Sequence, residues 1–453
     1  MKKGDPTSLG TERIRLLIPQ YAIPSIIAML ATSLYNVVDS IFIGQGCGPL
    51  AIAGLAICFP MMNLSAAFGA MVGVGASTVI GIRLGQKDYE GAEYAIGNVV
   101  ILNVIIGTLF MLVYLIFLDE ILIFFGASEN TLTYARDSMI VLLWGNIITH
   151  LYHGLTNVLR ATGYPQRAMG ITIFSVIINI LFNYIFIFVL EMGIMGAAIG
   201  TICAQSVALL AIIYHFSRPN TYLRFKRHIF KFRSKMAGEV ISIGASSFFN
   251  NCCACLVVLL INNSLKQYGG DLYIGAYGIA NRIVMIFAMV AMGLHQGIQP
   301  IVSFNFGARQ FERFLKTFKL GVICATLITF SAFIAGELFA RPIVKLFTTD
   351  EQLIEYSCHA MHIMVVVFPL VGFQMVSIAF FTAIGKAKKA IFLSLTRQLI
   401  FLIPMLLILP PFFGTDGVWM SMPISDMLSV VTVSIMIYFQ IKQLRQEIAL
   451  SKA

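Results

Sequence analysis

The amino-acid sequence predicts an all-α polytopic membrane protein in which twelve transmembrane helices form two bundles of six. Hydrophobic residues make up 58% of the 453-residue chain and charged residues only 11%, whereas roughly a quarter of the residues in soluble domains are charged. Twelve apolar segments, separated by short polar links, are long enough to cross a bilayer as helices. The second half of the chain also repeats the first. These observations exclude an ordinary soluble domain.

The twelve apolar segments are separated by polar, glycine-containing or basic links. The first segment carries two prolines, Pro19 and Pro24, and one acid, Asp39. No short apolar segment with a small-residue cleavage site precedes it, so no signal peptide is expected. The expected spans are residues 14–43, 51–81, 94–118, 132–159, 168–190, 194–216, 238–264, 273–304, 317–339, 355–384, 390–411 and 417–440.

The distribution of lysine and arginine predicts the orientation in the membrane. Of the 31 basic residues, 25 fall in the two termini and in the links on one side, and four fall in the links on the other side. By the positive-inside rule, both termini are cytoplasmic and the chain is a multi-pass protein of the plasma membrane. The same distribution accounts for the net charge of +10, so no nucleic-acid partner is expected.

The two halves of the sequence are related by one nearly constant offset in residue number, which shortens by one near the end of the repeat. Each half holds six spans, so the repeats run in parallel about a pseudo-two-fold axis along the membrane normal, as in one class of alternating-access transporter. The expected organisation is an N-lobe at 1–217, a basic linker at 218–237, a C-lobe at 238–441 and a cytoplasmic tail at 442–453. Matching positions include residues 52–54 with 274–276, 84–90 with 306–312, 161–163 with 383–385, and Gly193 and Gly196 with Gly414 and Gly417.

Asp39 in the first span is the first candidate functional residue. A carboxylate inside a transmembrane helix costs a few kcal/mol and is usually kept where it meets a partner, a cavity or a moving cation. Tyr35 and Asn36 precede Asp39 by four and three residues, so the three side chains are expected to share one helix face. The alternative is an acid at the outer end of the helix that reaches the headgroups and is satisfied by water.

Several motifs in register across both halves resemble the multidrug and toxic compound extrusion (MATE) family of cation-coupled exporters, and the last three resemble its MepA-like branch. The resemblance covers nearly the whole chain. The motifs are Pro24 with Asp39, residues 84–86, 160–163, 179–183, 193–201 and 304–308, and then Leu409-Pro410, Gly417-Val418-Trp419 and Pro423-Ile424-Ser425-Asp426.

The resemblance implies a V-shaped fold in which an N-lobe and a C-lobe face each other around a cleft that opens alternately to each side. It also implies a coupling site at Asp39, Asn179, Asn183 and Thr201, and a rearrangement of the first span near Pro24. Family members that couple through the N-lobe carry an acid at the position of Asn183, so this site has one negative charge fewer.

Helix periodicity places Asn179 and Asn183 on one face, and Thr201 and Gln205 on another, so oxygen ligands from three helices are able to converge beside Asp39. One carboxylate with neutral oxygens suits Na⁺ or H⁺ as the coupling ion. The alternative for the two asparagines is interhelical hydrogen bonding without an ion.

The second half holds charged and polar residues in apolar surroundings, which usually pair with one another or face a water-filled cavity. Asp426 occupies the repeat position of Gln205 and either forms a structural ion pair with Arg397 or serves as an anchor for cationic substrate or a second proton site. The candidates for the substrate cleft are Asp426, Arg397, Gln374, Gln205 and Arg282.

The predicted function is cation-coupled antiport of amphipathic, cationic drugs or toxic organic compounds by alternating access. The alternative is a flippase for lipid-linked precursors within the same broad superfamily. The sequence contains no P-loop, no paired catalytic carboxylates and no metal motif, so neither enzymatic activity nor a cofactor beyond the coupling ion is expected. The expected partners are small-molecule substrates and the lipid bilayer, and the chain is expected to be a monomer.

Overall fold

The computed structural model describes residues 7–219 and 221–452, and every regular element within those residues is helical. Outside the described part of the chain lie residues 1–6, residue 220 in the predicted linker and Ala453 in the predicted tail. Residues 1–6 include Lys2 and Lys3, which count toward the basic residues of the N-terminus. The short elements are α1 (Ser8–Thr11), α5 (Leu118–Phe124), η2 (Arg227–Ile229) and α13 (Ala340–Val344).

In the described residues, ten spans are long and apolar enough to cross a membrane without a sharp break. Seven of these are α2 (Ile14–Cys47), α3 (Pro49–Gly85), α4 (Tyr89–Ile116), α9 (Gly193–Ser217), α10 (Ser234–Tyr268), α11 (Asp271–Gly307) and α12 (Phe311–Leu338). The others are α8 (Pro165–Tyr184) continued by the π-helix η1 (Ile185–Val189), α16 (Ala387–Leu395) continued by η3 (Thr396–Leu402) and α17 (Ile403–Ile408), and α18 (Pro410–Lys452).

The remaining two expected spans are each broken into two shorter helices. Residues 132–159 form α6 (Glu129–Trp144) and α7 (Asn146–Ala161), which meet at Gly145. Residues 355–384 form α14 (Glu351–Val365) and α15 (Phe368–Ala383), which are bent by 51°. Pro369 lies in the first turn of α15, where it lacks the N–H that would continue the preceding helix. By length and apolar character the described residues thus hold ten spans, or eleven when α14 and α15 count as one bent span. Helices α6 and α7 stand where the twelfth span was expected.

The internal repeat extends to the backbone geometry of the turns. Gly48 and Gly270 have φ values of 83° and 81°, and Lys87 and Arg309 have φ values of 61° and 55°. Non-glycine residues rarely adopt a positive φ, so the same conformation at equivalent positions of the two repeats indicates two copies of one turn. Two further pairs with positive φ are Gly163 with Gly385, and Gly193 with Gly414.

The chain divides into two compact units that exchange the first parts of two helices. Unit 1 comprises Met1–Thr11 and Ile27–Phe248, and unit 2 comprises Glu12–Ile26 and Phe249–Ala453. The two crossing points, after residue 26 and after residue 248, occupy equivalent positions in the two repeats. Helix α2 stays helical through both of its prolines, and its crossing point lies two residues after Pro24. A hinge at Pro24 stays a prediction.

Small residues allow the exchanged segments to pack closely. In unit 2, a Cβ at Gly297 of α11 would lie 2.5 Å from the Cα of Ala22 in α2. In unit 1, a Cβ at Gly75 of α3 would overlap the carbonyl oxygen of Val240 in α10, and one at Gly244 would overlap that of Met71. Such close approach of helix backbones is typical of membrane proteins, and Ala22 and Gly244 occupy equivalent repeat positions.

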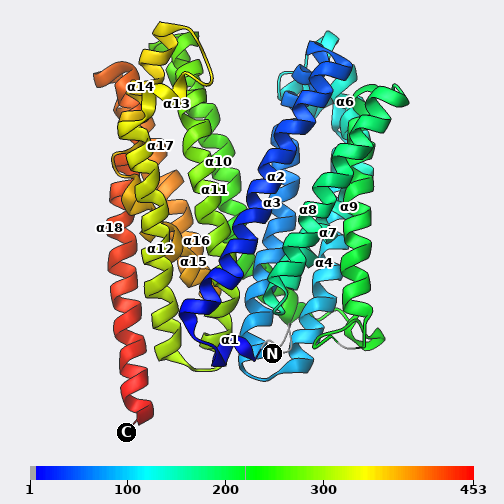
Figure 1. Cartoon of the computed structure of the whole chain (residues 1–453), viewed down its shortest axis with the longest axis vertical. Coiled ribbons are helices and arrows are strands. Elements are labelled where there is room, and N and C mark those ends of the chain that lie inside the picture. The colour runs from blue at the N-terminus through cyan, green and yellow to red at the C-terminus, as the bar shows by residue number, and fades with distance from the viewer. Residues whose placement is uncertain (1–6, 220, 453) are drawn as a thin grey trace. The chain divides into compact units, whose positions relative to one another are not determined.

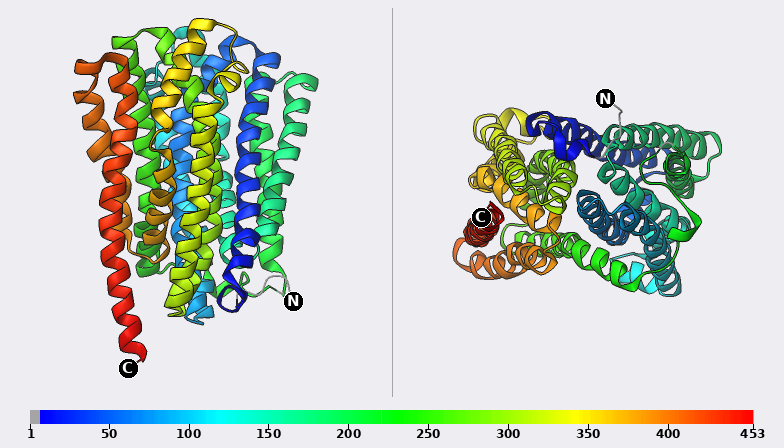
Figure 2. Two further views of the ribbon diagram at one scale, coloured as in Figure 1. Left: turned by 60° about the vertical axis from the view of Figure 1, so that its left-hand side comes forward. Right: turned by 90° about the horizontal axis from the view of Figure 1, so that it is seen from below.

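Helices α8 and α9 pack side by side in unit 1, with α7 as their neighbour (Figure 1). This arrangement brings the polar residues of the fifth and sixth spans together. In unit 2, α18 extends beyond the ends of its neighbours (Figure 2). Gly414 is non-helical and kinks α18 near its start. The helix that follows it still reaches about 57 Å, well beyond the hydrocarbon thickness of about 30 Å, so we expect its C-terminal end to project out of the bilayer.

Candidate functional site

Polar side chains from α2, α8 and α9 converge in unit 1 around Asp39. The amide nitrogen of Asn183 donates hydrogen bonds to Asp39 Oδ1 at 2.5 Å and to Asn179 Oδ1 at 3.0 Å. The amide nitrogen of Asn179 in turn donates to Thr201 Oγ1 at 3.3 Å, and the Tyr35 hydroxyl lies 3.0 Å from the same oxygen. We call these five residues the Asp39 cluster. The structure thus brings together five of the six residues expected at the coupling site.

The hydrogen-bond directions in the Asp39 cluster follow from the available protons. The Thr201 hydroxyl donates its one proton to the carbonyl of Ala197, 3.1 Å away. It therefore accepts the bonds from both Asn179 and Tyr35. Asp39 stands at the end of this chain as an acceptor only, and in the described part of the protein no lysine or arginine forms an ion pair with it.

The Asp39 cluster has acceptor capacity that its own donors do not fill. The side-chain oxygen of Asn183 is buried and lacks a hydrogen-bond partner among the described residues. Asp39 accepts a single hydrogen bond there, from Asn183, although a carboxylate has about four lone-pair sites. Buried oxygens without donors are costly, and a proton on Asp39 or a bound cation would lower that cost. Asn179, Asn183 and Thr201 are 3%, 0% and 9% exposed, so water has limited access.

Asn36 lies outside the cluster. Its side chain is exposed, and its recorded hydrogen bond is made by the backbone carbonyl, which accepts from Ser40. The reason is the helix period. A helix turns by about 100° per residue. Viewed down the axis, Tyr35 therefore lies about 40° from Asp39 on one side, and Asn36 lies about 60° from it on the other side. The cluster forms on the side of Tyr35.

Gly200 leaves room for the side chain of Asn183. A Cβ at position 200 would overlap Asn183 Oδ1, so we expect Gly200→Ala to rotate the Asn183 amide away from Asp39. Gradient-driven transport should fall at least about tenfold, since a hydrogen bond to a charged group contributes about 1.5–3 kcal/mol. The matched control is Gly238→Ala in α10, where a Cβ meets nothing within 4 Å. Equal transport by both variants would show that the Asn183 orientation is unimportant.

A second buried polar network lies between α3, α4 and α7 and was not predicted from the sequence. Ser65 Oγ donates to Asn146 Oδ1 at 2.5 Å and lies 3.0 Å from His150 Nε2. The amide of Asn146 donates to the carbonyl of Gly107 at 3.2 Å. Asn146 and His150 are one helical turn apart directly after the break at Gly145, which is the one sequence signal that points to them.

In unit 2, Arg397 and Asp426 form an ion pair. Arg397 Nε donates to Asp426 Oδ1 at 2.7 Å, and the Asp426 side chain is 11% exposed. Ser425 Oγ also donates to the carbonyl of Arg397 at 2.8 Å, within the π-helical segment η3. The structure therefore realises the ion pair, one of the two alternatives for Asp426.

The other three residues expected at a substrate cleft lie in different surroundings. Gln374 is buried and donates to Ser429 Oγ at 2.6 Å, and its own oxygen lacks a partner among the described residues. Gln205 accepts a 2.5 Å hydrogen bond from Thr149 in unit 1. Arg282 is exposed and belongs to unit 2. Their role in substrate binding stays a prediction.

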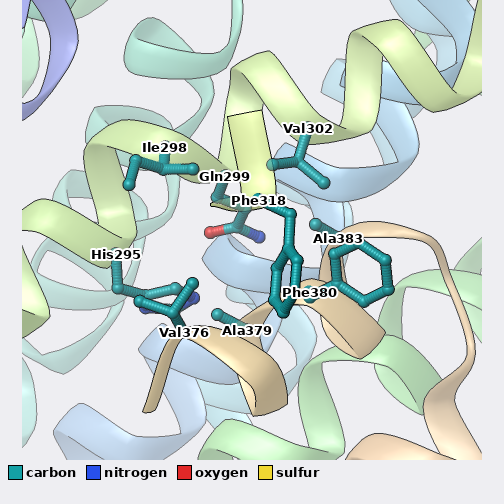
Figure 3. A pocket seen from close by; sticks show the side chains of 9 residues that line it. All are labelled: His295, Ile298, Gln299, Val302, Phe318, Val376, Ala379, Phe380 and Ala383. Atoms are coloured by element: carbon teal, nitrogen blue, oxygen red, sulfur yellow. The ribbon is translucent and has the colours of Figure 1, made fainter. Parts of the chain in front are cut away.

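A small cavity lies inside unit 2 between α11, α12 and α15 (Figure 3). Its volume is about 10 Å³, and apolar side chains such as Ile298 and Phe380 form most of its wall. His295 and Gln299 contribute the polar groups. Ligand pockets for drug-sized molecules measure roughly 300–1,000 Å³, so this cavity lies below the size of a drug site.

The sequence profile of the family described as MatE matches residues 24–185 and again residues 246–408. The two matches begin at equivalent positions of the two repeats, and together they cover well over half of the chain. The chain belongs to the MatE family. The double match also shows that each half of this MatE protein carries the family pattern on its own.

Known relatives of this MatE protein resemble it over nearly their whole length. The multidrug export protein MepA of Staphylococcus haemolyticus is 28% identical over 434 residues, which cover 96% of this chain and 94% of the relative. A structure of an outward-facing multidrug resistance MATE family transporter of the MOP superfamily has a TM-score of 0.91 at 25% identity, with 98% and 99% of the two chains covered. A MOP superfamily transporter from Pyrococcus furiosus Vc1, described as having a binding pocket of reverse polarity that suggests a different function, has a TM-score of 0.91 at 26% identity, with 98% and 100% covered.

These comparisons confirm the MATE resemblance and its MepA-like branch. They also confirm the predicted fold class for this MatE protein, and they agree with a multi-pass membrane protein. The roles assigned to the individual residues of the Asp39 cluster stay predictions.

Proposed function

We propose that this MatE protein is a cation-coupled antiporter that exports amphipathic, cationic small molecules across the plasma membrane. The single observation that carries the proposal is the Asp39 cluster, in which a carboxylate accepts one hydrogen bond and a neighbouring buried amide oxygen lacks a donor among the described residues. A site of this kind gains stability when H⁺ or Na⁺ neutralises Asp39. The MepA relative is a multidrug export protein, which supports small organic compounds as substrates.

Coupling requires that the ion and the drug prefer opposite conformations, because a ligand with equal affinity for both states shifts no equilibrium. In the proposed cycle, the inward ion gradient neutralises Asp39 and thereby stabilises the state that releases the drug outside. The first span rearranges near Pro24 during this step. The ion-bound protein then returns to the inward-facing state, and the ion leaves Asp39 on the cytoplasmic side before the next drug molecule binds.

In this proposal, the preference of the site for one ion over another comes from neutral oxygens. They belong to Asn179, Asn183, Thr201 and Tyr35. Monovalent ions suit a site with one carboxylate, because one positive charge balances it. No nucleotide or other cofactor takes part, nucleic acid is not a partner, and the monomer is the transporting species.

Transport into sealed vesicles with separately imposed gradients tests the proposal. Purified protein is reconstituted, and uptake or release of a fluorescent cationic dye is followed with a proton gradient, a Na⁺ gradient or neither. We expect one gradient alone to drive dye against its concentration, with no net movement when an ionophore dissipates it. Dye transport that is independent of both gradients would contradict coupling through Asp39.

The flippase alternative gains no support from the relatives described above. It predicts a different result in the same vesicles, namely transfer of a lipid-linked precursor between leaflets without movement of dye. That result would replace the antiporter proposal.

A further inference from the structure

An open groove lies on unit 1 where the first turns of α8 meet the last turns of α9. It has about 690 Å³ of empty space, part of which is open to the surroundings. Two arginines, Arg167 and Arg218, stand on its wall together with Tyr214 and His215. The rest of the wall is formed by Gly170 and by the aliphatic side chains of Ile171 and Ala211. The Asp39 cluster contains none of these residues.

Both arginines are fixed by a hydrogen bond and an aromatic ring. Arg167 Nη1 donates to His215 Nδ1 at 2.8 Å, and its guanidinium carbon lies 4.8 Å from the centre of the Tyr164 ring. Arg218 Nη2 donates to the Tyr214 hydroxyl at 2.9 Å, with its guanidinium carbon 4.4 Å from that ring centre. A free arginine near a helix end usually extends toward water without a fixed geometry. These two guanidinium groups are instead held in place before any ligand arrives.

The positive charge of the groove is not balanced by the protein. Neither Arg167 nor Arg218 forms an ion pair with a carboxylate in the described part of the chain. Since a guanidinium group has no acceptor, His215 Nδ1 must accept the bond from Arg167, and the ring proton then sits on Nε2. His215 Nε2 is buried and lacks a partner there. Because neither arginine is paired with a carboxylate of the described chain, an anion in the groove would meet two unbalanced positive charges.

In the membrane orientation expected from the sequence, the groove lies at the level of the lipid phosphate groups. Arg167 is the third residue of α8, and Arg218 directly follows the last residue of α9, so both stand at the same ends of two adjacent spans. In the orientation expected from the lysine and arginine distribution, these ends lie on the cytoplasmic side. Deeper in the groove, Ile171 and Ala211 offer an apolar surface of the kind that an acyl chain contacts.

We propose that this groove binds the phosphate group of an anionic phospholipid, with Arg167 and Arg218 as the two cationic contacts and the acyl chains running along Ile171 and Ala211. Arginine suits phosphate oxygens because its donors form a planar fork, and basic pockets between membrane helices bind acidic headgroups in this way. The inference depends on the proposed membrane orientation and not on ion-coupled export.

Gly170 provides a way to fill the groove without changing its charge. A Cβ at position 170 meets nothing within 4 Å, so Gly170→Leu places a side chain in open space and should also favour the helix, since glycine costs about 1 kcal/mol in a helix interior. Loss of lipid binding in this variant cannot be attributed to lost arginines or to unfolding. Gly170→Leu therefore tests the shape of the groove, and the double variant Arg167→Gln/Arg218→Gln tests its charge.

The test is native mass spectrometry of the full chain in mild detergent, titrated with phosphatidylglycerol, with phosphatidylcholine of the same acyl chains, or with inorganic phosphate. We expect the wild type to bind phosphatidylglycerol more tightly than phosphatidylcholine. The double arginine variant should weaken phosphatidylglycerol binding about 30-fold, and Gly170→Leu should also weaken it. The charge-matched control Lys442→Gln/Arg445→Gln, on the exposed end of α18, should bind as the wild type does.

Each arm gives a decisive result. Equal binding of the two lipids by the wild type, or equal binding of phosphatidylglycerol by the wild type and the double arginine variant, would overturn the proposal. Binding of inorganic phosphate that competes with phosphatidylglycerol and disappears in the double arginine variant would overturn the lipid assignment in favour of a soluble phosphate compound. None of these results depends on transport, so failure here and failure of the antiporter proposal are distinguishable.

Discussion

Asp39→Asn is expected to abolish gradient-driven export while the protein stays folded. Asparagine keeps the shape of the side chain and its oxygen still accepts from Asn183, 2.5 Å away in the wild type. It has no negative charge to be neutralised by H⁺ or Na⁺, so the ion gradient no longer biases the conformational equilibrium. In vesicles, accumulation of dye driven by either gradient should fall to the level of vesicles without protein.

The folded state of Asp39→Asn should be at least as stable as the wild type. The half-buried carboxylate of Asp39, with one hydrogen bond, pays a desolvation cost that a neutral amide avoids. Thermal unfolding in detergent measures this directly, and the exposed acid Glu120 provides the matched control Glu120→Gln in the same unit. Export at the normal rate by Asp39→Asn would reject the coupling role, and loss of export by Glu120→Gln would show that the assay responds to any lost acid.

Asp426→Asn is expected to destabilise unit 2 by about 3 kcal/mol, the lower end of the range for one partner lost from a buried ion pair. The lower end applies because the Arg397 side chain is 31% exposed and water screens part of its charge. The variant leaves the Arg397 guanidinium without the carboxylate that it contacts at 2.7 Å. Chemical or thermal unfolding of the purified protein measures the loss.

The double variant Arg397→Gln/Asp426→Asn separates the two roles considered for Asp426. If the pair is structural, removing both charges restores most of the stability and leaves dye export intact. If Asp426 anchors cationic substrate, the double variant regains stability but still fails to export. Asp416→Asn is the control, since its ion pair with His359 is about half exposed and should contribute less than about 1 kcal/mol.

The transmembrane layout was predictable because each span has to be apolar along its whole length. The breaks within the fourth and tenth spans were not. Val141 to Trp144 precede Gly145, and Ile147 and Ile148 follow the single polar residue Asn146. The averaged hydropathy therefore continues through a position where the helix stops. Pro369 hints at the second break, but α2 contains Pro19 and Pro24 and remains one helix. Surrounding packing, which hydropathy does not report, decides whether such a residue interrupts a span.

The candidate site was predictable in part. The four-residue spacing of Asn179 and Asn183 correctly placed both amides on one face, and Thr201 came from the family resemblance. Asn36 was grouped with Asp39 because a three-residue spacing allows it, yet the rotation of α2 exposes it. The bond between Ser65 and Asn146 joins residues 81 positions apart, and no periodicity within one helix indicates a partner at that distance.

Helices α2 and α10 each begin in one compact unit and end in the other. The effect of a substitution in either helix therefore depends on its side of the crossing point. A change before residue 27 of α2 acts on the packing of unit 2, and a change after that point acts on unit 1. In α10 the order is reversed, so two neighbouring substitutions in one span can destabilise different halves of the molecule.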